Sequence, residues 1–212
     1  AYVYTRTGST WVETELTSDA TAGYYFGRSV AIDGDTLAVG ASGGNAVYIY
    51  TRSGSSWSLQ QKLTKSTGSF GISVDIDGDT LIAGRDMENI DSDDKIEGAA
   101  YIYTRSGSSW TQQKKLIAPT PYPLPENGAA HYGYAVAIDG NTVVVGAHQF
   151  HYTGNYSGSA YVYSGSGSTW TLEGDLAALA GADLEAADHF GFSVDVSGDT
   201  VLVGAYLDGE PN

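Results

Sequence analysis

The sequence has no cysteine, and only ten lysines and arginines stand against 25 aspartates and glutamates, so the formal net charge is −15 at pH 7. Without cysteine the chain forms no disulfide, carries no thiolate nucleophile and ligates no metal through sulfur. Nucleic acid and anionic membranes are poor partners for this chain, because binding phosphate groups needs clustered positive charge. We therefore expect no nucleic-acid partner, and cations and neutral ligands remain open.

Long apolar runs and the common catalytic motifs are missing as well. No stretch of 18 apolar residues occurs, so we expect no membrane insertion. The sequence contains no nucleophile elbow, no P-loop and no dinucleotide-binding fingerprint. These absences predict that the protein is not an enzyme.

What the sequence does contain is repetition. A first phrase opens the chain as AYVYTRTGSTW and returns from Val47, Ala100 and Ala160. A second phrase, FGRSVAIDGDTLAVGA in its first copy, starts at Phe26, Phe70, Tyr132 and Phe190. The two phrases alternate strictly along the chain. Such repetition from end to end predicts one domain over residues 1–212.

Each repeat reads as a meander of four short antiparallel strands. The second phrase holds two β-branched, apolar stretches around Asp33-Gly34, a dipeptide favoured in type I′ hairpin turns. The first phrase adds a third strand and, after a Ser-Gly turn, a more polar fourth strand that begins at tryptophan. No helix of normal length is expected, although residues 176–187 contain enough alanine for a turn or two.

Four such meanders predict an all-β fold, a β-propeller of four-stranded antiparallel blades. A β-sandwich would not explain four near-identical units. Three blades are complete, at residues 26–63, 70–116 and 132–176. The fourth is split between the termini, with its outer strands in residues 1–16 and its inner strands in residues 190–205.

The two phrases resemble FG-GAP repeats, the blades of integrin-α-type propellers, and are most similar to the bacterial form of these repeats. The resemblance covers nearly the whole chain and departs from the pattern at Tyr132, which replaces Phe, and at Arg85, which replaces Ala. The family's calcium loop, D-x-D-x-D-G-x-x-D, is absent, because the two-residue turn leaves no room for it. The resemblance implies a non-catalytic protein outside the cell or on its surface that acts in assembly or adhesion.

The split blade predicts an assembly surface. An isolated two-stranded hairpin is marginal in water, and an unpaired strand edge favours pairing with another strand. The residues that we expect at this junction are Ala1, Tyr2, Val3, Tyr4, Phe190, Val194, Val201 and Val203. Three arrangements remain open: closure of a ring within one molecule, head-to-tail pairing into a filament, or a fragment of a longer propeller.

Two groups of carboxylates are candidate cation sites. The loop RDMENIDSDDKIEG holds oxygen ligands of the kind that Ca²⁺ prefers, at Asp86, Asn89, Asp91, Asp93, Asp94 and Glu97. In the inner strands, Asp75 and Asp195 would lie on opposite blades of a closed four-bladed ring, where a cation could bind between them. The alternative for both groups is structural, since acidic loops are commonly solvated and inner-strand carboxylates accept hydrogen bonds from neighbouring blades.

Other features have a simpler structural explanation. His131 and His189 occupy one repeat position, just before the Phe-Gly motif, where Tyr25 and Ser69 stand in the other repeats. The tyrosines recur at period two in strands, so blade packing explains them better than a sugar-binding surface. Asn155 begins the only N-glycosylation sequon, Asn-Tyr-Ser.

Two functions from different classes follow. In the first, the protein is a filament subunit that joins head to tail with a second copy of itself through the split blade. In the second, it closes on itself as a monomer and binds carbohydrate, an extracellular protein or calcium through the long loops at residues 86–97, 118–130 and 148–158.

Overall fold

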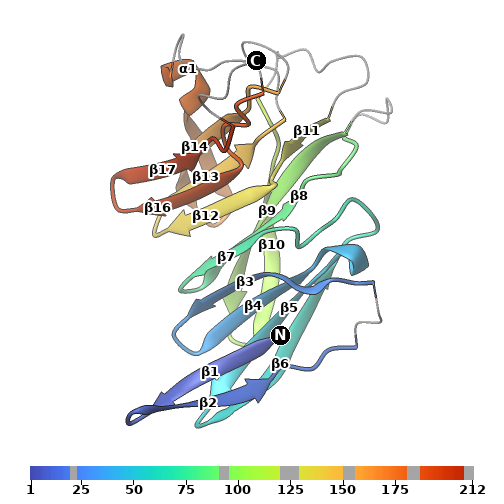
Figure 1. The fold of residues 1–212 in the computed structure, drawn as a ribbon, viewed down its shortest axis with the longest axis vertical. Coiled ribbons are helices and arrows are strands. Elements are labelled where there is room, and N and C mark those ends of the chain that lie inside the picture. The colour runs from blue at the N-terminus through green and yellow to red at the C-terminus, as the bar shows by residue number, and fades with distance from the viewer. Residues whose placement is uncertain (20–22, 91–95, 120–128, 150–155, 181–186, 208–212) are drawn as a thin grey trace.

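The computed structural model describes residues 1–212 except for 20–22, 91–95, 120–128, 150–155, 181–186 and 208–212 (Figure 1). Three four-stranded antiparallel sheets form the centre of the molecule, and we name them blades 1 to 3. Blade 1 comprises β3 (Phe26–Asp33), β4 (Thr36–Ala41), β5 (Ala46–Ser53) and β6 (Ser56–Thr64). Blade 2 comprises β7 (Val74–Asp77), β8 (Thr80–Arg85), β9 (Ile96–Ser106) and β10 (Ser109–Leu116). Blade 3 comprises β12 (Ala135–Asp139), β13 (Thr142–Ala147), β14 (Ser159–Ser166) and β15 (Thr169–Asp175).

A two-stranded sheet flanks this stack at each end. The first half-blade is β1 (Tyr2–Thr7) with β2 (Thr10–Glu15), and the last half-blade is β16 (Ser193–Ser197) with β17 (Thr200–Gly204). The two half-blades lie at opposite ends of the molecule (Figure 1). The predicted all-β, propeller-type fold of four-stranded blades is confirmed, and the ring is not closed.

Three short elements complete the described part of the chain. β11 (Ala129–Tyr132) pairs in parallel with β9, a turn of 3-10 helix spans Ser42–Gly44, and α1 (Leu176–Ala180) is a five-residue helix after blade 3. The helical turn expected in the alanine-rich segment is therefore present in α1.

The hairpin turns lie one residue later than the sequence predicted. Asp33 is the last strand residue and pairs with Thr36, so the two-residue loop is Gly34-Asp35. Gly34 has a φ of +52°, and Asp35 is not among the residues with positive φ. One glycine at the first central position is typical of a type II′ turn rather than type I′. The carboxylate of Asp33 is thereby free to contact the next blade.

In blade 1 the Phe-Gly motif opens strand β3 as expected, but in blades 2 and 3 and in the last half-blade the corresponding motif precedes the strand. In blade 2, β7 begins at Val74, and Phe70 and Gly71 precede it in a turn. Gly71 has a φ of +87°, and a Cβ atom there would lie 2.4 Å from the carbonyl oxygen of Ala46. Only glycine fits this close approach of two blades. The motif is thus a joint between blades.

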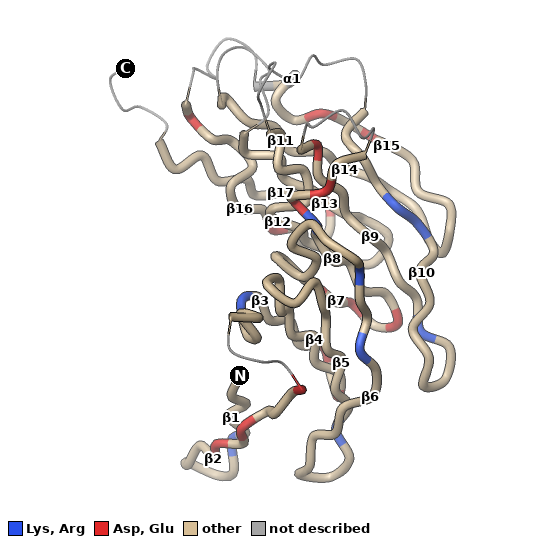
Figure 2. Tube along the Cα trace, turned by 90° about the vertical axis from the view of Figure 1, so that its right-hand side faces the viewer, with Lys and Arg blue, Asp and Glu red and all other residues tan. Residues whose placement is uncertain are grey.

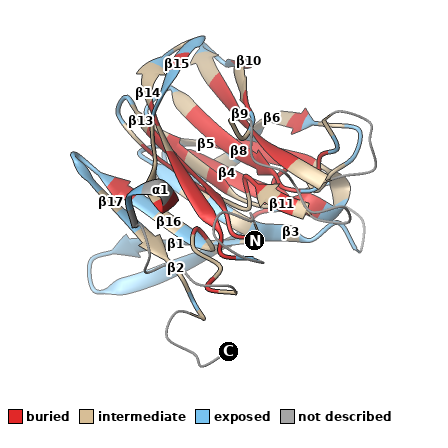
Figure 3. Cartoon of the chain, turned by 90° about the horizontal axis from the view of Figure 1, so that it is seen from above, coloured by how far each residue is buried: buried red, intermediate tan, exposed pale blue. Residues whose placement is uncertain are grey.

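The hydrophobic core is a series of layers between neighbouring sheets. One layer joins blades 1 and 2, a second joins blades 2 and 3, and two smaller layers join the half-blades to blades 1 and 3. Residues on β4, β5, β8 and β9 are mostly buried, whereas β1, β2 and β3 are largely exposed (Figure 3). Blades 2 and 3 are covered on both faces by their neighbours, whereas Val30 and Ile32 on β3 of blade 1 and Leu202 on β17 of the last half-blade are exposed at the two ends.

Candidate assembly surface

The inner strand of blade 1 exposes two apolar side chains that the other blades bury. Val30 and Ile32 on β3 are 65% and 62% exposed. Their counterparts on β7 and β12 are at most 8% exposed: Val74, Ile76, Val136 and Ile138. Each counterpart lies under the blade that precedes it. We name the exposed surface of β3 the head face, because the equivalent surface in blades 2 and 3 is covered by the preceding blade.

The last half-blade presents the opposite surface. Leu202 on β17 is 70% exposed, whereas its counterparts Ala38, Ile82 and Val144 are 0% exposed. In blades 1 to 3 this position lies under the blade that follows. We name this surface of β17 the tail face. Head and tail faces are the two sides of an interface that is complete elsewhere in the chain.

Strand β1 has a free edge and an exposed surface. The third strand of each complete blade pairs with the second strand, whereas β1 pairs only with β2 among the strands that the structure describes. Tyr2 and Tyr4 are 59% and 55% exposed, and their six counterparts in the blades are at most 6% exposed. Trp11 on β2 is 65% exposed, against 2% for Trp110 and 7% for Trp170.

An apolar recess of about 240 Å³ lies between the first half-blade and blade 1. Its lining includes Ala1, Tyr2, Val3, Leu16, Val30 and Ile32. It therefore adjoins both the free edge of β1 and the head face. The first half-blade corresponds to the third and fourth strands of a complete blade, and the recess lies where the first and second strands would be. The strands that correspond to these are β16 and β17, at the other end of the molecule.

Carboxylates at the hairpin turns link each blade to the next. The turn Asp of one blade accepts a hydrogen bond from the N–H of the turn Gly in the following blade: Gly78 to Asp33 at 2.8 Å, Gly140 to Asp77 at 2.7 Å and Gly198 to Asp139 at 2.6 Å. The last half-blade has Ser197 at the position of this aspartate. The turn of the last half-blade therefore lacks the carboxylate that the other three turns use to contact the next blade.

Asp75 serves as a second link between blades. One carboxylate oxygen accepts the N–H of Ile76 at 2.9 Å, and the other accepts the N–H of Ile138 in blade 3 at 2.8 Å. Burial raises the pKa of Asp75, the nearby Asp195 raises it further, and these two hydrogen bonds oppose the shift. The structure thus gives Asp75 a structural role, and cation binding between Asp75 and Asp195 stays a prediction.

Asp195 repeats only half of this pattern. It accepts the N–H of Val196 at 2.9 Å, and its side chain is exposed at the tail face. The counterpart of Ile138 in blade 1 is Ile32, which occupies the same register position on the head face. An acceptor at the tail thus corresponds to a donor at the head.

The acidic loop is divided among several contacts. Asp86 is hydrogen-bonded to His131 (Oδ2 to Nδ1, 2.8 Å), and Glu97 accepts the N–H of Ile90 at 2.8 Å. Asn89 has an interaction of its own, and Asp91, Asp93 and Asp94 lie outside the described residues. Within the described segments no three His, Asp or Glu side chains are grouped as metal ligands. Calcium binding by this loop stays a prediction.

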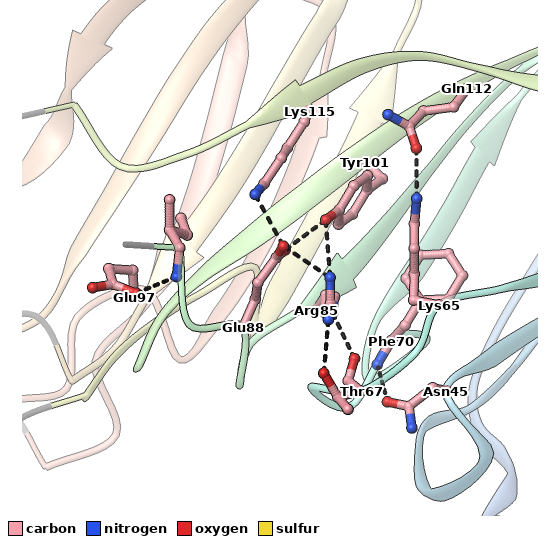
Figure 4. A network of polar contacts seen from close by, with 11 residues as sticks. Asn45, Lys65, Thr67, Phe70, Arg85, Glu88, Glu97, Tyr101, Gln112 and Lys115 are labelled. Atoms are coloured by element: carbon pink, nitrogen blue, oxygen red, sulfur yellow. Dashed lines mark hydrogen bonds and ion pairs between the residues drawn. The ribbon is translucent and has the colours of Figure 1, made fainter. Parts of the chain in front are cut away.

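The sequence analysis missed Glu88, which lies at the centre of a buried network (Figure 4). Glu88 contacts the Arg85 guanidinium at 2.8 Å and the Lys115 ammonium at 2.9 Å, and it accepts the hydroxyl hydrogen of Tyr101 at 2.5 Å. Arg85 also donates to the carbonyl oxygen of Thr67 at 2.6 Å. Burial and the hydrogen bond to Glu88 raise the pKa of Tyr101 to about 12. All these groups pair with one another, so the network is structural.

The predicted junction residues differ in their surroundings. Ala1 and Val3 pack against blade 1, and Val194 and Val201 pack against blade 3. Tyr2 and Tyr4 are exposed, and Phe190 donates its N–H to Ser157 at 2.9 Å. Val203 pairs with Val194 within the last half-blade. The repeat alignment could have revealed Val30, Ile32 and Leu202, because their counterparts are core residues in every other blade.

Charge is distributed unevenly along the chain. All ten lysines and arginines lie in residues 1–115, and residues 116–212 contain eleven aspartates and glutamates, all four histidines and no lysine or arginine. The basic residues that are drawn lie on the first half-blade and on blades 1 and 2 (Figure 2). Arg6 on β1 and Arg28 on β3 are exposed at the head end. The tail end therefore carries no lysine or arginine, whereas the head end carries Arg6 and Arg28 together with the carboxylates Glu13 and Glu15 on β2.

Two further observations bear on the candidate sites. Asn155, the glycosylation candidate, lies outside the described residues. Among the described helices none is long and apolar enough to cross a membrane.

Comparison with known proteins identifies the repeats. The family described as FG-GAP repeat matches residues 12–56, 57–103, 110–163 and 170–212. No curated protein matches the chain. Among solved structures, Saccharomyces cerevisiae Sqt1 is similar at 12% sequence identity with a TM-score of 0.48, over 73% of this chain. The similar region spans 36% of the Sqt1 chain.

Proposed function

The chain belongs to the FG-GAP repeat family, and from that premise we propose that it is a non-catalytic subunit, outside the cell or on its surface, that assembles head to tail. In this assembly the last half-blade of one copy completes a blade with the first half-blade of the next. The observation that carries the proposal is the pair of complementary faces, with Leu202 exposed at one end and Val30 and Ile32 at the other. Two such faces on one molecule generate an open filament when each meets a second copy.

The three complete blades define the register of the proposed junction. Val144 on the second strand pairs with Val162 on the third, and the same register recurs in blades 1 and 2. Transferred to the half-blades, this register places Leu202 opposite Val3. Their neighbours then pair as Val201 with Tyr4 and Val203 with Tyr2.

This register alternates between two kinds of pair. Asp33 and Thr36 flank a two-residue turn and therefore exchange hydrogen bonds. Counting along the ladder, the Val201–Tyr4 and Val203–Tyr2 pairs are hydrogen-bonded, and the Leu202–Val3 pair is not. The junction would gain about four backbone hydrogen bonds, each worth roughly 0.5–1.5 kcal/mol. Burial of the exposed apolar side chains would add to this.

The occupant of the head face is a second copy in this proposal, because the chain's own tail lies at the far end of the molecule (Figure 1). Closure within one molecule would have to bend interfaces that are already closely packed. At the interface of blades 2 and 3, the α-carbon of Gly84 lies so close to the carbonyl of Gly133 that no Cβ fits between them.

The test is a cysteine pair at the proposed junction. The chain has no cysteine of its own, so Val3→Cys combined with Leu202→Cys reports on this contact alone. Pairs without hydrogen bonds place their Cα atoms about 4.5 Å apart, within the range that a disulfide spans. After mild oxidation we expect a ladder of covalent oligomers on a non-reducing gel. Negative-stain electron microscopy should show filaments.

The control moves one cysteine by one residue. Val3→Cys combined with Val203→Cys places the two thiols on opposite faces of the sheet, so it should give no ladder. A covalently closed monomer from the first pair would overturn the filament and support a ring that binds its ligands through loops. Absence of any cross-link at micromolar protein concentration would overturn the junction itself.

A further inference from the structure

Two repeat positions, with different residues at each joint, lie where one blade meets the next. The first position follows the Gly-Ala or Gly-Arg at the end of a second strand, and the second precedes the Phe-Gly motif of the following blade. Between blades 2 and 3 the pair is Asp86 with His131, in contact at 2.8 Å. Between blade 3 and the last half-blade it is His148 with His189, whose ring centroids are 5.6 Å apart.

The joint between blades 1 and 2 has the same design. Ser42 and Ser69 hold the two positions and line one shared recess. The residues before Phe-Gly have nearly the same backbone in all four repeats, with φ of +53° at Tyr25, +60° at Ser69, +52° at His131 and +56° at His189. The backbone is therefore constant at this position, and the side chain is what differs from joint to joint.

The ends of the chain carry the two unmatched members of this series. Tyr206 is the counterpart of His148 and is 57% exposed, and Tyr25 is the counterpart of His189 and is 68% exposed. Both are tyrosines, whereas the other joints use Ser with Ser, Asp with His, and His with His. Two tyrosines stack well with each other, so the chain contains a matched pair that is not used within the molecule.

The surroundings of His148 show what Tyr206 lacks. Within its own blade, the ring of His148 packs against those of His131 and Tyr134, with centroids 5.4 and 4.2 Å apart. In the next half-blade it packs against the rings of His189 and Phe192. Tyr206 makes the two equivalent contacts within its own half-blade, with His189 at 5.1 Å and Phe192 at 4.6 Å. His148 also contacts His189 and Phe192 in the following half-blade, and Tyr206 has no following blade in its own chain. The residues at the repeat positions of His189 and Phe192 in blade 1 are Tyr25 and Arg28.

We propose that Tyr206 of one copy packs between Tyr25 and Arg28 of the next copy, and that this contact determines the pairing of copies. Tyr206 then stacks on the ring of Tyr25 and lies against the guanidinium of Arg28, which gains a cation–π contact. This inference rests on the proposed head-to-tail assembly and adds the residues that select the partner. Because each joint has its own residue pair, a tail fits the head of blade 1 better than the face of any other blade.

The test transplants a pair from another joint. Tyr206→Asp and Tyr25→His recreate at the junction the Asp86–His131 contact between blades 2 and 3. Histidine suits position 25, because His131 and His189 already hold the same positive φ. Assembly is measured by sedimentation and light scattering over a concentration series. Each single change should raise the protein concentration needed for half-assembly by roughly tenfold.

The double variant should bring this concentration back to within about threefold of the wild type, because the partners match again. A purely structural role of either tyrosine would not produce such a rescue. Met87→His is the control. This side chain is half-exposed and lies in blade 2, away from the head and tail faces, so the variant should assemble as the wild type does. Circular dichroism confirms that each variant is folded.

The outcomes separate the two proposals. If the cysteine pair at positions 3 and 202 yields the ladder and both single tyrosine variants assemble normally, the tyrosine contact is wrong and the junction stands. If both single changes weaken assembly and the double variant is no better, direct pairing of Tyr206 with Tyr25 is likewise refuted. If the wild type gives neither ladder nor filaments, the assembly itself fails.

Discussion

At the residue scale, glycine allows the closest approaches between blades. A Cβ atom on Gly84 would lie 1.8 Å from the carbonyl oxygen of Gly133 in blade 3 and 2.3 Å from the Ser73 hydroxyl. Gly84→Ala should therefore push blades 2 and 3 apart and lower the free energy of unfolding by about 3 kcal/mol. Urea denaturation measures this change. Gly174→Ala, where nothing lies within 4 Å, is the matched control, and equal midpoints for the two variants would contradict the argument.

A second residue-scale prediction concerns acid. His148 is buried, and burial together with the neighbouring His131 and His189 lowers its pKa to about 4, from 6.5 in the unfolded chain. Between these values the unfolded chain binds a proton that the folded protein does not, so stability falls as the pH falls from about 6.5 towards 4. We expect His148 to account for a loss of about 2 kcal/mol by pH 5.

Urea denaturation at pH 7 and pH 5 measures this loss. His148→Gln removes the ionisable group, so its stability should depend less on pH over the same interval, whatever the substitution costs in packing. Parallel pH profiles for the wild type and the variant would show that His148 is protonated as readily in the folded protein as in the unfolded chain.

At the scale of elements, blade 2 depends on the ion pairs around Glu88. The side chains of Arg85 and Glu88 are each 10% exposed. Glu88→Gln leaves the Arg85 and Lys115 charges without their carboxylate, and the free energy of unfolding should fall by about 3 kcal/mol. The control Asp35→Asn breaks the Arg52–Asp35 pair, in which the Asp35 side chain is 66% exposed, and should cost less than about 1 kcal/mol. Thermal unfolding compares the two, and equal losses would contradict a buried network.

The elements also show how far the sequence leads. The repeats predicted the four-stranded sheets and the split blade, because strand periodicity and turn residues are local signals. The turn shifted by one residue because Asp33 pairs with Thr36 and its carboxylate contacts the next blade. The sequence could not show which carboxylates of the acidic loop are engaged in structural contacts, since the partners of Glu88 include Lys115 on another strand. The repeat alignment assigns Ile32 and Ile76 to the same core position, and their exposures of 62% and 5% differ because the ring is open, which the sequence alone could not show.

At the scale of the whole molecule, polarity follows from having one head and one tail. Leu202→Asp places a charge on the tail face, and Ile32→Asp places one on the head face. Both side chains are exposed in the single chain, so neither change should unfold it. Each variant alone should remain monomeric, because one of the two surfaces that every junction needs is charged in all copies.

A mixture of the two variants should behave differently. The intact tail of the Ile32→Asp variant can dock on the intact head of the Leu202→Asp variant, and neither remaining end can grow. We therefore expect a one-to-one complex of twice the chain mass in sedimentation, with no larger species. The control variant Met87→Asp, whose changed residue lies away from the head and tail faces, should still form filaments. A symmetric interface, in which like faces meet, would give the same masses before and after mixing and would exclude head-to-tail growth.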